Sequence, residues 1–165
     1  MNSWYIQKQE WLQKHKNCAK CILFTCKSLT YIIYIAYICA ILYLLITQQF
    51  KFLIVFITIP ACGFLLETGI RAKLNRPRPY EVLDIPPLQK KDTQGKSFPS
   101  RHAFSAAILS VSFYFLNPKL GFLFILFSII IGFCRIFMGV HWIKDVVAGL
   151  LFGWIFGYLG FFLFF

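Results

Sequence analysis

The stretch "CILFTCKSLTYIIYIAYICAILYLLIT", residues 21–47, decides the fold class of this chain, because Lys27 is its single charged residue. A helix needs about 20 predominantly apolar residues to cross the hydrocarbon core of a bilayer. The stretch exceeds that length, so we expect the first transmembrane helix here. Lys27 lies near one end of it, where a lysine side chain can extend to the lipid headgroups.

Four further apolar runs follow, at about 52–70, 99–116, 120–137 and 140–165. Hydrophobic residues make up 59% of the chain, and its mean hydropathy is +0.68. Soluble domains usually hold about 45–50% apolar residues. Residues 4–16 mix aromatic side chains with lysines and glutamines, a pattern typical of a helix at the membrane surface. The sequence therefore predicts an all-α integral membrane helical bundle, with about five transmembrane helices plus an N-terminal interfacial helix.

We expect a single domain over residues 1–165, with an interfacial segment at 1–20 and a polar loop at 72–99. The loop is rich in proline, and its backbone polar groups could not be satisfied in lipid. It must therefore lie outside the membrane or cover a cavity. Lys90, Lys91 and Lys96 are expected to flank the entrance for a charged headgroup.

The formal net charge is +11, and most basic residues lie in residues 1–27 and 71–101. Basic residues at membrane ends attract lipid headgroups or anionic ligands. No nucleic-acid-binding motif accompanies them, so we expect membrane lipids and an anionic ligand as partners, and no nucleic acid. Cys18 and Cys21 form a C-x-x-C pair without the histidines of a zinc site, which favours a structural role.

The ends of the apolar runs converge if each run crosses the bilayer once. The second run ends at Arg71, the third starts near His102, the fourth ends near Arg135 and the fifth starts near His141. All four points then lie on one membrane face, which predicts one shared site. Glu67 lies one helical turn before Arg71, and a carboxylate this deep in the membrane is expected to pair with an arginine.

The arginines of this site indicate a phosphate ligand. A guanidinium presents a planar fork that matches two phosphate oxygens and keeps its charge when partly buried. We expect Arg71, Arg78 and Arg135 to clamp the phosphate. Proline and serine before the third run mark a helix start, where free N–H groups bind anions. Ser100 and the Arg101 amide are therefore expected to donate to phosphate oxygens.

His141 and Asp145 lie four residues apart, on one face of a helix. A carboxylate that binds one imidazole nitrogen fixes the tautomer and leaves the other nitrogen able to attack phosphorus. His102 is the candidate acid for the leaving group. Two alternatives are interfacial anchoring of these residues and a metal site. No second carboxylate or histidine cluster accompanies the pair, so we expect no metal and no cofactor.

Three segments together resemble a known family. They are "RAKLNRPRP" (71–79), "PSRH" (99–102) and "CRIFMGVHWIKD" (134–145). They are similar to the K-x6-RP, PSGH and SR-x5-H-x3-D motifs of the type 2 phosphatidic acid phosphatase (PAP2) family, membrane lipid phosphatases related to vanadium haloperoxidases. The resemblance covers about residues 60–165. By position it implies His141 as nucleophile, His102 as acid and Asp145 as the residue that orients His141, with phosphate bound by Arg71, Arg78, Ser100 and Arg135.

The chain departs from the family motifs at three positions. Arg71 stands where lysine is usual, Arg101 replaces glycine and Cys134 replaces serine. Arg101 places a bulky cation beside the expected phosphate and favours a more highly charged substrate, such as a diphosphate. The family usually has six spanning helices, whereas we count five.

The resemblance implies a metal-independent lipid phosphatase acting through a phosphohistidine. Candidate substrates are undecaprenyl pyrophosphate, phosphatidylglycerol phosphate and phosphatidic acid. A lipid phosphotransferase using the same histidine, or a non-enzymatic transporter or scaffold, is the alternative.

We expect a multi-pass protein of a bacterial inner (plasma) membrane. The surplus of basic residues on the expected pocket side favours a cytoplasmic pocket. Bacterial members of the family mostly act on the outer face, so the side of the active site stays open.

Overall fold

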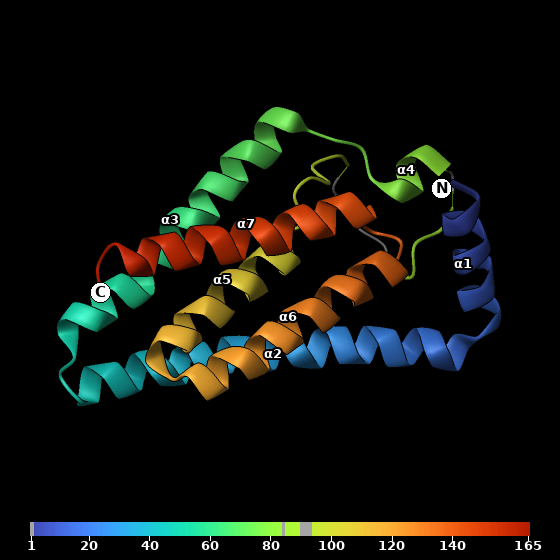
Figure 1. Ribbon diagram of the computed structural model, residues 1–165. Coiled ribbons are helices and arrows are strands. Elements are labelled where there is room, and N and C mark those ends of the chain that lie inside the picture. Colours follow the sequence, from blue (N-terminus) through green and yellow to red (C-terminus); the bar gives the residue numbers. More distant parts are fainter. Residues whose placement is uncertain (1, 84, 90–93) are drawn as a thin grey trace.

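The computed structural model describes residues 2–83, 85–89 and 94–165, and within these ranges it contains helices and no strand. Figure 1 shows the bundle that they form. The helices are α1 (Asn2–Lys14), α2 (Lys16–Ile46), α3 (Phe50–Leu74), α4 (Pro79–Leu83), α5 (Arg101–Leu116), α6 (Pro118–Phe137) and α7 (Ile143–Phe162). The predicted all-α membrane bundle is confirmed. The five long helices α2, α3, α5, α6 and α7 correspond to the five apolar runs, but α5 is not among the four segments that are long and apolar enough to cross a membrane.

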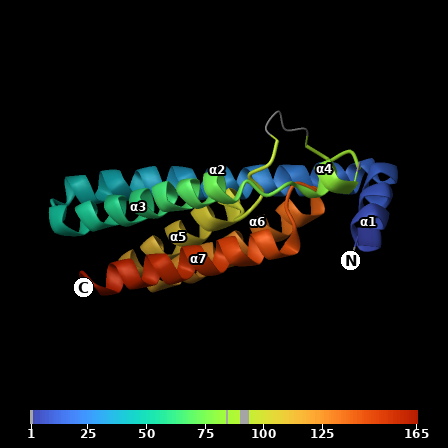
Figure 2. The same cartoon turned by 90° about the horizontal axis from the view of Figure 1, so that it is seen from above.

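Four segments of the described chain are long and apolar enough to cross a membrane. Three of them are the helices α2, α6 and α7, and the fourth is the stretch Phe50–Leu83, which contains α3. Seen from above, α2 and α3 run along one side of the bundle, and α5, α6 and α7 along the other (Figure 2). Large apolar side chains of α2, such as Phe24, Ile35 and Ile46, are exposed. Such a surface is suited to lipid rather than to water.

Helix α5 is the central helix of the bundle. Its residues 103–113 are all buried, and at 16 residues it is shorter than the neighbours that enclose it. Helix α7 approaches it through Gly149, Gly153 and Gly157. A Cβ at Gly153 would lie 2.6 Å from the carbonyl oxygen of Phe104. Small residues at this spacing allow membrane helices to pack backbone to backbone, which fixes α7 against α5.

Several predicted boundaries were wrong. The first long helix, α2, begins at Lys16 rather than near residue 21, and α1 ends at Lys14. Helix α3 continues to Leu74, and the predicted loop at 72–99 holds the short helix α4. Helix α7 begins at Ile143 rather than near residue 140, because the Asp145 side chain binds the Trp142 amide and closes the helix start there.

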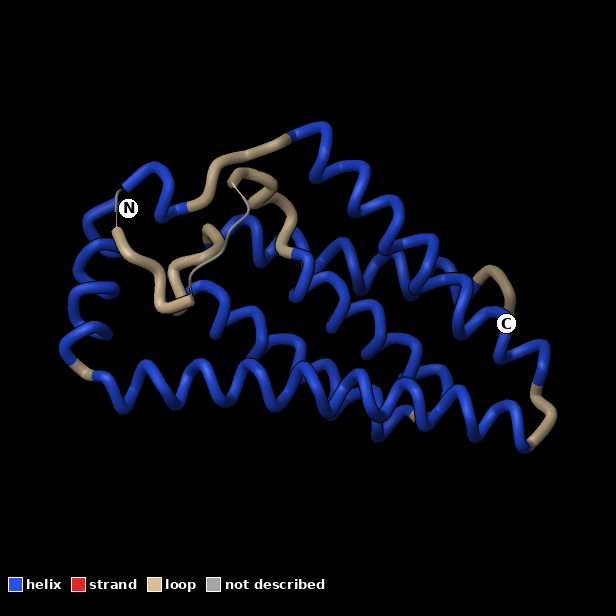
Figure 3. The backbone as a smooth tube through the Cα atoms, turned by 180° about the vertical axis from the view of Figure 1, so that it is seen from behind, coloured by secondary structure: helices blue, strands red, loops and turns tan. Residues whose placement is uncertain are grey.

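The segments that carry the predicted site residues lie at one end of the bundle. The C-terminal ends of α3 and α6, the N-terminal ends of α5 and α7, and the helices α1 and α4 all lie there (Figures 1 and 3). The turn between α2 and α3 and the C-terminus lie at the other end. This is the convergence that the spacing of the apolar runs predicts.

Candidate active site

The start of α7 is built around Asp145, which is fully buried. Its Oδ2 atom accepts hydrogen bonds from the Trp142 amide at 3.0 Å and from the Ser97 hydroxyl at 2.5 Å. Its Oδ1 atom lies 3.3 Å from Nη1 of Arg76. A buried carboxylate is costly unless such donors compensate it. Asp145 therefore ties the polar segment before α5 to the first turn of α7.

His141 lies beside Asp145 and is equally buried. Its Nδ1 atom lies 2.9 Å from the carbonyl oxygen of Ser97 and 3.9 Å from Oδ2 of Asp145. We predicted that Asp145 would bind the ring directly, but the nearest acceptor is the Ser97 carbonyl. A carbonyl only accepts, so in the neutral ring Nδ1 carries the proton and Nε2 carries the lone pair. That tautomer is the one a nucleophilic imidazole needs.

The N-terminus of α5 lies next to this pair. The Ser100 amide donates to the Asp145 carbonyl at 2.8 Å, which joins α5 to α7. The Ser100 hydroxyl is buried and has no hydrogen-bond partner among the described residues. A buried hydroxyl at a helix N-terminus is well placed to bind an anion, because the first N–H groups of the helix point the same way.

Arg71 and Arg78 fasten the segment before α5 to its neighbours. The buried Arg78 donates from Nε to the Gly95 carbonyl at 3.0 Å and from Nη1 to the Val140 carbonyl at 3.2 Å. Arg71 donates to the Pro99 carbonyl. Both guanidinium groups are therefore held at the site, since Val140 directly precedes His141 and Pro99 directly precedes Ser100.

Glu67 joins two arginines at the end of α3, as its position predicts. One of its oxygens lies 3.4 Å from Nε of Arg71, and the other lies 3.4 Å from Nε of Arg101. Arg101 also donates to the Thr68 hydroxyl at 3.2 Å and lies over the ring of Phe64. The Arg101 side chain is thus engaged on the α3 side, so phosphate binding by that side chain stays a prediction.

Arg135 is buried and lines a cavity. Its Nη1 atom donates to Oε1 of Gln89 at 3.3 Å and lies 3.8 Å from Sδ of Met138. Its Nε–H is buried and has no hydrogen-bond partner within the described ranges. A buried cation with an uncommitted donor is an expected feature of an anion site.

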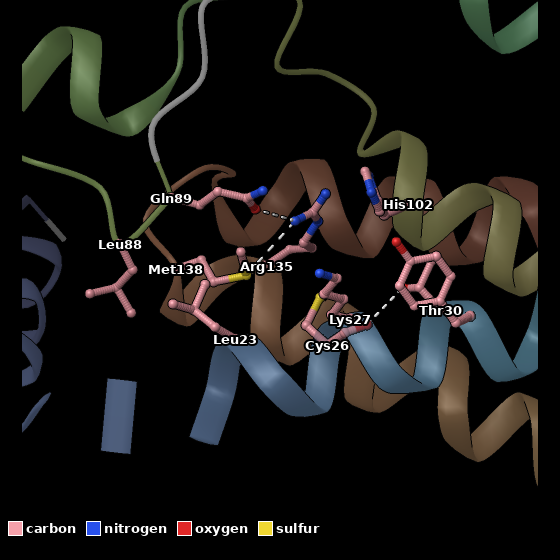
Figure 4. A pocket seen from close by; sticks show the side chains of 10 residues that line it. Leu23, Cys26, Lys27, Thr30, Leu88, Gln89, His102, Arg135 and Met138 are labelled. Carbon is pink, nitrogen blue, oxygen red and sulfur yellow. Dashed lines mark hydrogen bonds between the residues drawn. The ribbon is translucent and has the colours of Figure 1, made fainter. Parts of the chain in front are cut away.

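A cavity of about 530 Å³ opens in front of Arg135 (Figure 4). It is lined by Leu23, Cys26, Lys27, Thr30, Tyr31, Leu88, Gln89, His102, Arg135 and Met138. Lys27 and Arg135 are basic residues of this lining, and no described lining residue is acidic. Together with the apolar residues, they suit a ligand with an anionic head and an apolar body.

Sequence reasoning missed four residues of the site. Ser97 and Arg76 hold Asp145, Gln89 binds Arg135, and Lys27 lines the cavity. We predicted that Lys27 would reach the headgroups at a helix end, whereas the structure places it in the cavity wall. Because α2 already begins at Lys16, Lys27 lies farther from the helix end than predicted, and a lysine in an apolar run was the available signal for this role. Of the expected entrance lysines, Lys90 and Lys91 lie outside the described residues.

No group of three or more histidine, cysteine, aspartate or glutamate side chains in the described part of the chain could hold a metal ion. Metal independence itself stays a prediction, to be tested with a chelator.

Fold and site together define a helical membrane protein with a buried histidine near the start of α7 and a cavity lined by His102 and Arg135. The chain belongs to the PAP2 superfamily, whose family model matches residues 52–165. Helices α1 and α2 precede the matched region, although α2 supplies part of the cavity wall.

Among curated relatives, the chain is similar to undecaprenyl-diphosphatase BcrC of Bacillus subtilis, with 38% identity over 65 residues. That match covers 39% of this chain and 34% of the relative. A lipid A 1-phosphatase of Rhizobium johnstonii is 31% identical over 103 residues, which is 59% of this chain and 41% of the relative. The chain thus spans about a third to two fifths of the length of these two relatives.

Two solved structures share the fold. Aquifex aeolicus LpxE superimposes with a TM-score of 0.70 and 24% identity, over 86% of this chain and 85% of that one. A transmembrane PAP2 type phosphatidylglycerolphosphate phosphatase from Bacillus subtilis gives a TM-score of 0.64 and 18% identity, over 97% of this chain and 92% of that one. The predicted family is confirmed, and the relatives carry names of lipid phosphatases.

Proposed function

We propose that this protein is a membrane lipid phosphatase that hydrolyses a lipid phosphomonoester or diphosphate through a phosphohistidine on His141. The observation that carries the proposal is the hydrogen bond from His141 Nδ1 to the Ser97 carbonyl. In the neutral ring this bond leaves the lone pair on Nε2, which supports Nε2 as the attacking atom. The buried Arg78, which binds the carbonyl of the preceding Val140, supports a phosphate ligand at this position. Membership of the PAP2 superfamily and the names of the relatives support the same activity.

The proposed reaction has two steps. The Nε2 lone pair of His141 attacks phosphorus, and the bond from phosphorus to the leaving oxygen breaks while His102 gives that oxygen a proton. Water then attacks the phosphohistidine, His102 takes a proton from this water, and the P–N bond breaks to release phosphate. Arg135 and the Ser100 hydroxyl stabilise the charge that builds on the phosphoryl oxygens in both steps.

We propose a lipid diphosphate, of which undecaprenyl pyrophosphate is one example, as the preferred substrate. The cavity offers Lys27 and Arg135, two cations from different helices, and a diphosphate carries more negative charge than a monoester. The names of BcrC and of a second undecaprenyl-diphosphatase among the relatives support this choice. Phosphatidylglycerol phosphate, phosphatidic acid and lipid A are the competing substrates to be compared.

We propose that the protein crosses a bacterial plasma membrane several times. The membrane face on which its pocket opens then determines which lipids can reach it. A pocket on the outer face would meet undecaprenyl pyrophosphate released outside the cell. A cytoplasmic pocket would meet phosphatidylglycerol phosphate where it is made.

The test is phosphate release by the full chain in detergent from each of these four lipids, with EDTA present. We expect release from the diphosphate to be fastest, unchanged by EDTA and absent in His141→Ala. A lipid alcohol added as acceptor separates hydrolysis from phosphotransfer, because a transferase requires it for turnover. Equal release by His141→Ala would remove the proposed mechanism.

A further inference from the structure

Helix α1 lies outside the region that the family model matches, yet it packs on the connection that carries His141. In Figure 1 it stands at the end of the bundle where α6 ends and α7 begins. Its buried side chains Tyr5, Lys8 and Gln9 all face that connection. This burial is unusual for a helix that only rests on a membrane surface, whose polar face stays in water.

Two of these side chains bind the end of α6. Lys8 Nζ donates to the Ile136 carbonyl at 2.5 Å, and Gln9 Nε2 donates to the Phe137 carbonyl at 3.0 Å. Both carbonyls are among the last four of α6, which lack the N–H donor four residues on that a helix interior supplies. The Ile136 carbonyl also accepts from the Gly139 amide at 3.1 Å. A cation at a helix C-terminus is also favoured by the helix dipole. Burial lowers the pKa of Lys8 to about 8, so the ammonium form still predominates at neutral pH.

The third side chain binds the start of α7. The Tyr5 hydroxyl accepts a hydrogen bond from the Ile143 amide at 2.7 Å, and Ile143 is the first residue of α7. The Tyr5 ring meets the Trp142 ring edge to face, with centroids 5.1 Å apart. Burial raises the pKa of Tyr5, so its hydroxyl stays neutral at physiological pH. Tyr5 thus contacts Trp142, which directly follows His141, and the amide of Ile143.

Gln9 also fills the space beside Gly139 in the same connection. Gly139 has a φ of +74°, and a Cβ there would lie 2.2 Å from Gln9 Nε2. The backbone between α6 and α7 therefore adopts a left-handed conformation that favours glycine, directly against the α1 side chain. One face of α1 contacts the end of α6, the middle of the connection and the start of α7.

We propose that α1 is a positioning clamp for the connection 137–142 and so fixes the orientation of His141. Tyr5, Lys8 and Gln9 are positioning residues in this proposal, which rests on the proposed role of His141 as nucleophile. Loss of one clamp contact is expected to leave the cavity and its cations in place. It should slow the chemical step, because in-line attack demands accurate placement of Nε2.

The experiment compares Gln9→Ala and Tyr5→Phe with Gln7→Ala in the full chain. Gln7 is an exposed glutamine on the same helix, so its variant is the matched control. Hydrogen–deuterium exchange of residues 137–143 reports on the clamp, and phosphate release reports on its consequence. In Gln9→Ala and Tyr5→Phe we expect exchange of this segment to rise and kcat to fall about tenfold, with KM unchanged. Gln7→Ala should match the unsubstituted chain in both readouts.

Two results would overturn the proposal. One is exchange in 137–143 that stays the same in both clamp variants, and the other is faster exchange with an unchanged kcat. A thermal melt identifies a variant that has lost its fold, and Tyr5→Phe, which removes one oxygen atom, then supplies the decisive comparison. If the unsubstituted chain released no phosphate from any lipid, the proposed function would fail, and exchange alone would decide whether α1 clamps the connection.

Discussion

The buried half and the open half of the candidate site are built on different principles. In the buried half, Ser97, His141 and Asp145 bind one another, and each is at most 1% exposed. In the open half, Lys27 and His102 line a cavity of about 530 Å³. The buried half comes from the segment before α5 and from the start of α7, whereas α2 and α6 supply much of the open half.

Under the proposed mechanism, the buried half carries out the chemical step and the open half selects the ligand. A histidine with its tautomer fixed by a carbonyl is prepared for one reaction before any ligand arrives. Side chains around an open cavity act on whatever ligand enters, and their charge and shape decide which ligand stays. Substitutions in the buried half should therefore lower kcat, as should those of His102 and Arg135, which line the cavity but take part in the proposed chemical steps. Substitutions of the other polar lining residues, such as Lys27, should change the preference among substrates.

The largest effect is expected for His141→Ala. Removal of the proposed nucleophile should lower kcat by about ten-thousand-fold, since under the proposed mechanism neighbouring groups cannot replace Nε2. Phosphate release from the preferred lipid measures it. The buried position requires a thermal melt as control, and a variant that keeps both its fold and substantial turnover would contradict the assignment.

The second effect is expected for Arg135→Gln, which removes the cation at the boundary of the two halves. The loss of one donor to the phosphoryl oxygens should lower kcat by about a hundredfold. The matched control is Lys144→Ala, because Lys144 is an exposed cation only three residues after His141. If both variants lost turnover equally, the overall positive charge rather than Arg135 would be responsible.

The sequence predicts the buried half better than the open half for a physical reason. His141 and Asp145 are four residues apart in the sequence, so their proximity follows from the local course of the chain, although His141 precedes α7 rather than lying on one of its faces as predicted. The apolar runs also predict that Arg135 and His102 lie at one end of the bundle. The Ser97 carbonyl is a backbone atom, and its contact with His141 spans 44 positions. No residue pattern encodes such a contact.

The cavity wall was harder to predict, because α2 joins the site through packing between helices rather than through a motif. Lys27 fits two descriptions, a headgroup anchor or a pocket cation, and only the placement of α2 against α6 distinguishes them. Lys27 was missed as a cavity residue, whereas Arg101 was predicted as a phosphate ligand and is engaged elsewhere. Its position beside Ser100 predicts a phosphate ligand, whereas its side chain is paired with Glu67.

The third effect is expected for Ser97→Ala, which keeps the carbonyl that binds His141 but removes the hydroxyl that binds Asp145. Without this bond, Asp145 should be less firmly placed beside the His141 ring, from which its Oδ2 atom lies 3.9 Å away, and kcat should fall about tenfold with KM unchanged. Ser112→Ala is the control, because the Ser112 hydroxyl is also buried but binds only within α5. A rise in KM instead of a fall in kcat would assign Ser97 to substrate binding.

The smallest effect is expected for Lys27→Met, and it concerns preference. Loss of this cation should raise KM for a lipid diphosphate several-fold and leave KM for the monophosphate nearly unchanged, because the second phosphate loses a partner. Lys20→Met, an exposed lysine on the same helix, is the control. Equal changes for both lipids would show that Lys27 attracts the membrane substrate only through general charge.

The most direct test of His141 as nucleophile is to trap the intermediate. The full chain is mixed with lipid diphosphate carrying a radiolabelled terminal phosphate, quenched within milliseconds at alkaline pH, and digested for peptide mapping. We predict an acid-labile, alkali-stable label on the peptide that contains His141, which is absent in His141→Ala. A label on another residue, or steady phosphate release with no labelled protein, would contradict the phosphohistidine mechanism.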